Sequence, residues 1–196
     1  YAKKKGVAMR LQELVSVSRE VAATRRRLEK RRLLAALLQE AGRERAGVVV
    51  SFLTGRLPQG RVGLGPALLR DLGTGSADRA TLTVDELHRW VDDFAAVAGT
   101  GAKARRRALL VSLWRRTTAD ESTFLHRRFL GELRQGALEG LLVDAIAEAS
   151  ALPVADVRRA TMLAGCPAPV AEAALREGAA GLAGFRLTLL QPLQPM

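Results

Sequence analysis

Apolar residues recur every three or four positions along most of the chain, which is the spacing of one face of an α-helix. Over 11–41 this spacing, interrupted by arginines and lysines, predicts a single helix that Gly42 would end. The positions that define the apolar face are Val17, Val21, Thr24, Leu28, Ala35 and Leu38. The short apolar run 46–55 lies between helical segments, so we interpret it as a short core helix rather than a buried strand.

Capping and breaking residues bound the helices that follow. Pro66 follows Gly65, as is common at the first position of a helix, and this helix is expected to run to about Leu72. Two capping boxes, each a Thr with a Glu three positions later, open the helices after Thr83 and Thr118. The remaining predicted helices are 103–117, 119–132, 137–149, one from Pro153 to Gly165, and 169–177. With no alternating strand pattern, the chain is predicted to be all-α, a compact bundle of about ten short to medium helices.

Two six-residue segments share the pattern Gly-x-Leu-x-Gln-Gly. "GRLPQG" occupies 55–60 and "GELRQG" occupies 131–136, each between an apolar helix that contains Phe-Leu and a helix rich in Leu and Ala. We interpret the two as diverged copies of one helix–turn–helix unit, which gives the bundle an internal pseudo-two-fold repeat. The alternative is a chance match in a Gly- and Leu-rich chain. Two related turns on one face would suit a grip on both sides of a nucleic-acid duplex.

The charge balance is strongly basic. Lys and Arg total 31 against 20 for Asp and Glu, which gives a formal net charge of +11 and indicates a polyanionic partner such as nucleic acid. Residues 1–8 are expected to be a leader or added residues before Met9, and the basic excess survives their removal. The excess of Arg over Lys is also typical of a GC-rich genome, so compositional drift is the competing explanation.

Several chemistries are not indicated by the sequence. His88 and His126 are isolated and no metal-ligand spacing or P-loop motif occurs, so no catalytic residue, metal or cofactor is expected in this chain. Cys166 is the single cysteine, which excludes an internal disulfide and suits a reducing cytosol. No apolar run is long enough for a membrane span. Trp90, Trp114 and the phenylalanines fall on apolar faces and are expected in the core rather than as stacking platforms for bases.

Glycine turns beside cations are the candidate binding elements. Glycine lets an anion approach the backbone closely, and the N–H groups at a helix start attract it. "GTGAKARRR" (99–107) places Lys103 and three arginines in the first turn of a helix, where cations oppose the helix dipole, so an external anion is expected there. Each turn alone could be an ordinary helix cap and each basic run a solvated face. Arg61 and Arg134 stand beside the two Gly-x-Leu-x-Gln-Gly turns, so three glycine-containing helix starts carry extra positive charge. The agreement among the three favours phosphate binding.

Four stretches together resemble one protein family. They are "FLTGRLPQGRVGLGPALLRDL", "GTGAKARRRALLVSLWRRTTADESTFLHRRFLGELRQGALEGLLVDAIA", "LPVADVRRATMLAG" and the terminal "QPLQPM". The chain from about residue 11 onward is similar to the N-terminal DNA-binding domain of bacterial ATP-dependent DNA ligases. The last stretch resembles the lead-in to that family's nucleotidyltransferase domain, so 9–185 is expected to be the helical DNA-binding domain and 186–196 the start of a linker to that further domain.

The resemblance implies a function and a set of contacts. In this family the domain binds the minor groove on both sides of a nick, largely through phosphates and independently of sequence. Carried over by position, the contacts would lie in the turns around Gly60, Gly101 and Arg134. The DNA-binding residues expected here are Arg56, Gly60, Arg61, Gly63, Gly65, Gly101, Lys103, Arg105, Arg106, Arg134, Gly136 and Gly140. Glu132 and Ala102 depart from the lysine and serine that are frequent in the family and would weaken a contact.

The resemblance also sets expectations for the whole protein. The family's catalytic Lys-x-Asp-Gly motif does not occur here, so this chain should bind nicked double-stranded DNA without adenylylation, while the parent ligase would use ATP and Mg²⁺ in its catalytic domains. A cytoplasmic, nucleoid-associated monomer acting in repair, replication or recombination is expected. The alternatives are a sequence-specific helix-turn-helix regulator, a helical protein-interaction scaffold, and an enzyme in its own right.

Overall fold

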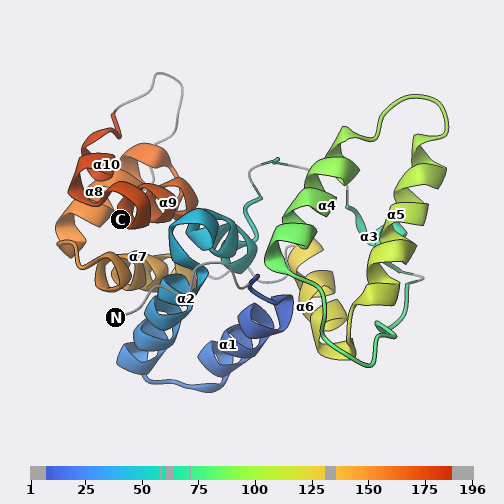
Figure 1. Cartoon of the computed structure of the whole chain (residues 1–196), viewed down its shortest axis with the longest axis horizontal. Coiled ribbons are helices and arrows are strands. Elements are labelled where there is room, and N and C mark those ends of the chain that lie inside the picture. Colours follow the sequence, from blue (N-terminus) through green and yellow to red (C-terminus); the bar gives the residue numbers. More distant parts are fainter. Residues whose placement is uncertain (1–7, 58, 61–63, 71, 131–135, 187–196) are drawn as a thin grey trace. The chain divides into compact units, whose positions relative to one another are not determined.

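The computed structural model describes residues 8–57, 59–60, 64–70, 72–130 and 136–186. Within these ranges the secondary structure is helical apart from one isolated β-bridge between Arg10 and Thr83, which confirms the all-α prediction (Figure 1). The helices are α1 Leu11–Ala23, α2 Arg27–Thr54, α3 Pro66–Leu69, α4 Val84–Ala96, α5 Ala102–Arg116, α6 Ala119–Phe129, α7 Gly136–Ser150, α8 Val154–Ala164, α9 Pro167–Glu177 and α10 Ala179–Ala183. No helix in the described ranges combines the length and apolar character needed to cross a membrane.

The chain forms two compact units. Unit 1 comprises Tyr1–Val15 and Leu57–Leu133, and unit 2 comprises Ser16–Arg56 and Arg134–Met196. Each Gly-x-Leu-x-Gln-Gly segment therefore contains a point at which the chain passes from one unit to the other. The internal symmetry itself stays a prediction, because residues 131–135 of the second segment lie outside the described residues.

Unit 1 is built on helices α4, α5 and α6 and on the start of the chain. The Leu11 N–H donates to the Leu82 carbonyl at 2.8 Å and the Val84 N–H donates to the Met9 carbonyl at 2.9 Å, which fixes the chain start beside α4. Both predicted capping boxes are present, at Thr83 and at Thr118. The fully buried apolar side chains of this unit include Leu11, Leu14, Leu82, Val84, Leu87, Val91, Phe94, Leu110 and Leu125.

Aromatic side chains complete the core of unit 1, as the sequence predicts. Phe94 is fully buried, with its ring centroid 5.0 Å from that of Trp90. The indole N–H of Trp90 donates to the Leu109 carbonyl at 3.2 Å, and that of Trp114 donates to the Gly73 carbonyl at 3.1 Å. These two bonds tie α4 to α5 and hold the loop before α4 against the end of α5.

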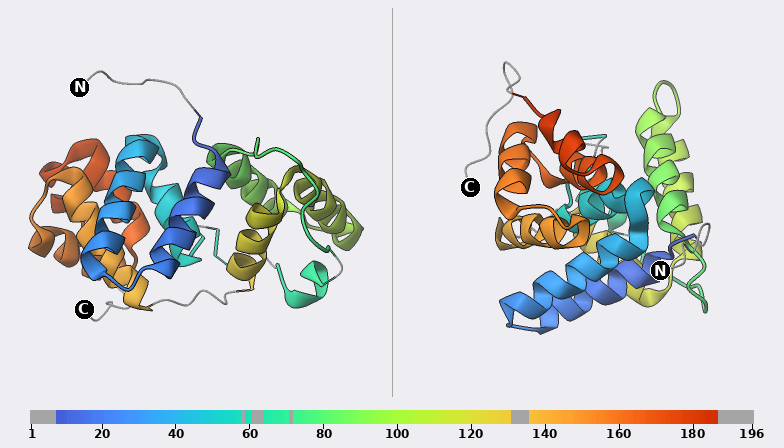
Figure 2. Two further views of the ribbon diagram at one scale, coloured as in Figure 1. Left: turned by 90° about the horizontal axis from the view of Figure 1, so that it is seen from below. Right: turned by 60° about the vertical axis from the view of Figure 1, so that its left-hand side comes forward.

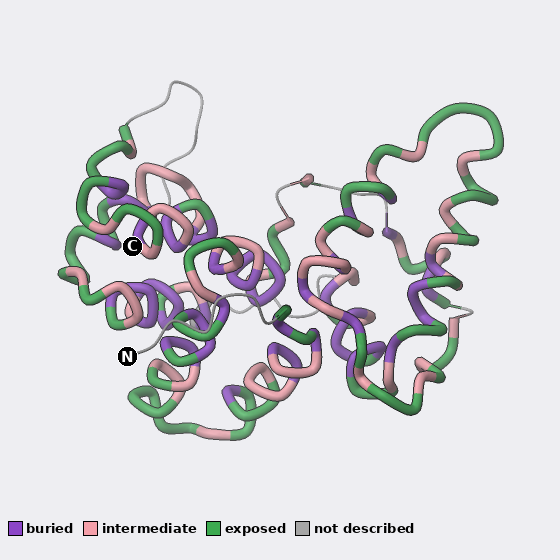
Figure 3. The backbone as a smooth tube through the Cα atoms, viewed as in Figure 1, coloured by how far each residue is buried: buried purple, intermediate pink, exposed green. Residues whose placement is uncertain are grey.

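Unit 2 is organised around α2. This helix packs along α7 and α9, and the two views of Figure 2 and the view of Figure 1 agree on that arrangement. The apolar side of α2 is buried at Leu34, Leu38, Val49 and Phe52, and the buried residues gather on the inward sides of the helices in each unit (Figure 3). The unit therefore has a core of its own.

The prediction of one helix over 11–41 is wrong. α1 ends at Ala23 and α2 begins at Arg27, and the Thr24 hydroxyl accepts from the Arg26 N–H while donating to Glu29. This local turn resets the helical phase, so Leu28, which the sequence pattern places on the apolar face, is 61% exposed. Gly42 does interrupt the helix, with φ 70° and ψ 178°, but helix resumes directly, and the run 46–55 belongs to α2.

Two further predictions need correction. The helix after Gly65 ends at Leu69 instead of about Leu72. Gly140, which the resemblance groups with the turn around Arg134, is an exposed position inside α7, and this helix begins at Gly136, close to the predicted start at 137. Helix propensities of neighbouring Ala and Leu residues allow a single glycine to remain helical.

Candidate nucleic-acid interface

The start of α5 is the most fully described of the predicted binding turns. Gly101 precedes the helix with φ 76°, a left-handed conformation that glycine adopts without strain, and a β-carbon added there would have no non-neighbouring atom within 4 Å. No acidic side chain lies in the first turn of α5, and Lys103, Arg105, Arg106 and Arg107 follow in its sequence. The turn and the basic run therefore lie where the sequence predicts them.

Two of these cations have partners inside unit 1. Arg105 donates to the Ala98 carbonyl, and Arg106 donates to the Val97 carbonyl at 3.0 Å. These carbonyls lie at the C-terminal end of α4, where the helix dipole is negative. The Arg106 guanidinium also lies 5.4 Å from the centroid of the Phe94 ring. The presence of Arg105 and Arg106 in the first turns of α5 is thus partly explained by their bonds to the end of α4, without an external anion.

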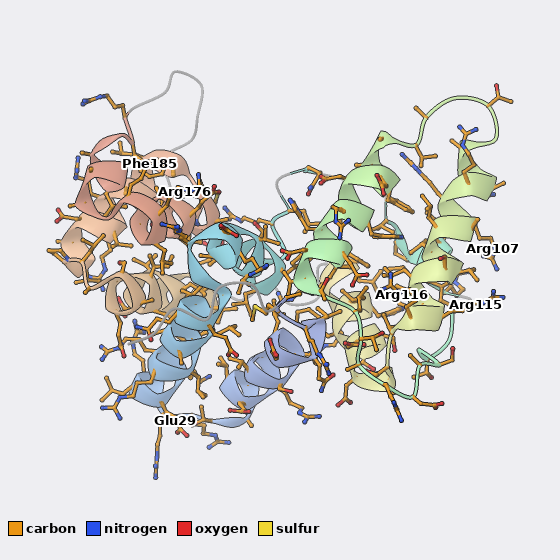
Figure 4. All side chains as sticks on the ribbon, viewed as in Figure 1. Glu29, Arg107, Arg115, Arg116, Arg176 and Phe185 are labelled. Carbon is orange, nitrogen blue, oxygen red and sulfur yellow. The ribbon has the colours of Figure 1, made fainter. Side chains whose placement is uncertain are left out.

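Three further cations of α5 have exposed side chains. Lys103, Arg107 and Arg115 are all exposed, and Figure 4 shows Arg107 and Arg115 pointing outward. Arg107 is four residues after Lys103 and neighbours it on the helix surface, whereas Arg115, eight residues further on, is rotated from Arg107 by about 80° around the helix axis. Arg107, Arg115 and Arg116 line a shallow depression together with Ala104, Ala108, Val111 and Ser112. We call Lys103, Arg107 and Arg115 the α5 basic face. The sequence analysis missed Arg115, which lies in the last turn of α5, far from the glycine turn at the start of that helix.

Arg116 is held by the first turn of α4. Its guanidinium donates to a Glu86 carboxylate oxygen at 2.7 Å, and the same carboxylate accepts from the Thr83 N–H at 2.9 Å. The Arg116 guanidinium and then the Thr83 N–H lower the pKa of Glu86 from 4.5 to about 2. This pair binds α4 to the end of α5 and so positions the α5 basic face.

We expect the Glu86 pair to give an acid-dependent stability. Because the folded-state pKa of Glu86 is depressed, its contribution is complete above about pH 4.5 and is lost as the pH falls toward 2. The Glu86→Gln variant keeps a group that can complete the capping box but loses the charge. Its free energy of unfolding at pH 7 should therefore be lower than that of wild type, by at most about 1 kcal/mol for a pair this exposed. Thermal unfolding at pH 7 and pH 2.5 measures this. A difference between the two proteins that persists undiminished at pH 2.5 would contradict the assignment.

The other predicted contact residues are distributed over both units. Gly60 has φ 68° and is exposed, and Gly65 precedes α3 with open space around it, both in unit 1. Gly136 and Gly140 belong to α7 of unit 2. Arg61, Gly63 and Arg134 lie outside the described residues.

Arg56 has an internal role in unit 2. Its side chain forms an ion pair with Glu139 at 3.2 Å and donates to the Gly165 carbonyl at 3.1 Å. It therefore links the end of α2 to α7 and to the C-cap of α8. Any contact with an external phosphate would compete with these bonds.

Two buried charged groups of α6 are structural. Glu121 is fully buried in its capping box with Thr118, and burial raises the pKa of its carboxyl. Arg128 is 6% exposed, with its guanidinium carbon 5.1 Å from the centroid of the Phe124 ring, and burial lowers its pKa to about 10. Among the described residues, no three His, Cys, Asp or Glu side chains gather where they could hold a metal ion.

These features define an all-helical domain with an exposed cationic helix face. Residues 72–147 match the family described as "DNA ligase N terminus". The chain is 53% identical over 190 residues to a probable DNA ligase of Anaeromyxobacter sp. (strain Fw109-5), covering 96% of this chain and 37% of that protein. It is 48% identical over 188 residues to a probable DNA ligase of Streptomyces griseus and 47% identical over 188 residues to one of Mycolicibacterium gilvum, with the same shares covered.

These matches confirm the resemblance inferred from the sequence. The chain belongs to the family of N-terminal domains of ATP-dependent DNA ligases. It spans 37% of the length of the probable DNA ligases to which it is similar.

Proposed function

We propose that the chain binds nicked double-stranded DNA as the N-terminal domain of an ATP-dependent DNA ligase. In this proposal it contacts phosphates along the minor groove on both sides of the nick, largely independently of base sequence. The family match and the basic surface support it, and the α5 basic face is the observation that carries it. The remainder of the ligase would contain the catalytic domains, which would use ATP and Mg²⁺.

The spacing of the α5 basic face suits a phosphate backbone. Residues four apart on an α-helix are separated by about 6 Å along its axis, so Lys103 to Arg115 spans about 18 Å. One strand of B-DNA advances about 3.4 Å per nucleotide, so the face extends along about five phosphates. The exposed Gly101 at the start of the helix leaves its backbone accessible at one end of this row.

Phosphate contacts explain both binding and weak sequence preference. Each cation that neutralises a phosphate releases counterions, which gives affinity for any duplex. The minor groove offers little base-specific information, so base readout adds little. Joined to catalytic domains, such a domain would raise the effective concentration of nicked duplex at the active site of the ligase. We propose that the ligase acts as a monomer at the nucleoid, in repair, replication or recombination.

The Lys103→Ala/Arg115→Ala double variant tests this proposal. Because two phosphate contacts are removed, the slope of log K against log salt should fall in magnitude by about two, with equal losses on duplexes of different sequence. The matched control is Arg79→Ala/Arg89→Ala, which removes two exposed arginines of unit 1 outside α5 and should leave the slope near that of wild type. Fluorescence anisotropy over a salt series measures both. Identical slopes for the α5 variant and wild type would refute a phosphate contact by this face.

A further inference from the structure

The turn between α1 and α2 carries a second concentration of cations, in unit 2. Six basic residues lie within 25–32, and Figure 3 shows this turn as largely exposed. Glu29 is the one acidic residue among them, and Figure 4 places it at the tip of the turn. The predicted DNA contacts include none of these residues.

Acidic side chains of α7 neutralise part of this charge. Arg27 forms an ion pair with Asp144 at 3.0 Å, and Arg31 forms one with Glu148. Asp144 also accepts from Arg158 of α8 at 2.9 Å. Arg27 and Arg31 are four residues apart and so lie on one side of α2, the side that faces α7. Their role is to join these helices.

Three arginines remain without such partners. Arg25, Arg26 and Arg32 are exposed, and none of their side chains makes a hydrogen bond or ion pair within the described part of the chain. Leu28 lies four residues before Arg32, hence on the same side of α2, and is 61% exposed. No described part of unit 2 therefore covers this side. We call Arg25, Arg26 and Arg32 the α1–α2 corner.

We infer that the α1–α2 corner is a second phosphate-binding surface for duplex DNA, separate from the α5 basic face and carried by the other unit. The inference rests on the proposed function, since the same ligand is assumed. Three unpaired like charges repel one another, and a polyanion removes that repulsion. All three are arginines, whose planar guanidinium donates two parallel hydrogen bonds to a phosphate. Each unit would then hold the duplex through its own cations.

The test compares two triple variants of the whole chain. The corner variant is Arg25→Ala/Arg26→Ala/Arg32→Ala, and its control, Arg43→Ala/Arg159→Ala/Arg186→Ala, removes three exposed arginines elsewhere in unit 2. With nicked duplex as the probe, the corner variant should lower the magnitude of the salt slope by about three, and the control should lower it by less than about one. Circular dichroism melting of both variants checks that unit 2 remains folded.

A conservative variant adds a second readout. Arg25→Lys/Arg26→Lys/Arg32→Lys keeps the charges, so its salt slope should return close to that of wild type. A corner variant with the wild-type slope, or a lysine variant with the slope of the alanine variant, would overturn the inference. If wild type itself does not bind duplex, the proposed function fails instead, so the two failures are distinguishable.

Discussion

The Phe94→Ala variant should lose about 3–5 kcal/mol of unfolding free energy. Phe94 has no exposed surface, packs against Trp90 at a centroid distance of 5.0 Å and lies under the Arg106 guanidinium. Removing the ring leaves a cavity between α4 and the start of α5 and deprives Arg106 of its aromatic contact. Urea unfolding followed by circular dichroism measures the loss.

Phe185→Ala is the matched control for this variant. Phe185 is only half-buried at the end of unit 2, so deletion of the same atoms should cost distinctly less. Neither substitution removes a charge, so the salt slope of DNA binding should stay unchanged under conditions where both variants are folded. Equal destabilisation by the two substitutions would contradict the placement of Phe94 in the core of unit 1.

The Gly75→Ala variant should be the second most damaging, with a loss of about 1–3 kcal/mol. A β-carbon at this position would lie 2.4 Å from the Thr117 carbonyl oxygen and 2.6 Å from the Thr118 carbonyl oxygen, where only backbone movement could relieve the overlap. The Gly75 N–H also donates to the Ser122 hydroxyl at 2.8 Å, and the Ala77 N–H donates to the Thr117 carbonyl at 3.0 Å. The substitution would lift this loop away from the junction of α5 and α6.

Gly65→Ala is the control for the glycine prediction. Gly65 has φ −99°, and a β-carbon added there would have no other atom within 4 Å, so alanine should be tolerated with a change within about 0.5 kcal/mol. Differential scanning calorimetry of the two variants gives the comparison. If the Gly75→Ala and Gly65→Ala proteins had the same melting temperature, the prediction would be wrong, and the loop would pack less closely against the α5–α6 junction than in this structure.

Local signals in the sequence were sufficient for much of the fold. The Thr83 and Thr118 capping boxes bond groups only three residues apart, so their sequence pattern predicts their structure directly. Proline after Gly65 and the glycine before α5 mark helix starts for the same local reason. The helical period likewise places Leu87, Val91 and Phe94 on one side of α4, and all three are buried.

Side-chain bonds that the helical period does not encode explain what the sequence analysis missed. The Thr24–Glu29 bond lies in the turn that ends α1 and changes the phase of α2, so Leu28 is exposed although a continuous helix would bury it. Arg105 and Arg106 bond to carbonyls at the end of α4, and Arg56 bonds to α7 and α8. A basic residue's role depends on whether an acceptor lies nearby in space, and sequence spacing does not report that. The sequence therefore predicted the Gly101 turn as a structural feature, but it did not single out Arg115 or the three exposed arginines that we propose as the α1–α2 corner.

Binding of duplex DNA through its phosphates is tested most directly by a salt titration of wild type with nicked duplex. We predict a linear fall of log K with log salt, with a slope that corresponds to several phosphate contacts, and similar affinities for duplexes of unrelated sequence. A flat salt dependence, or strong binding confined to one base sequence, would contradict phosphate binding as the function of this chain.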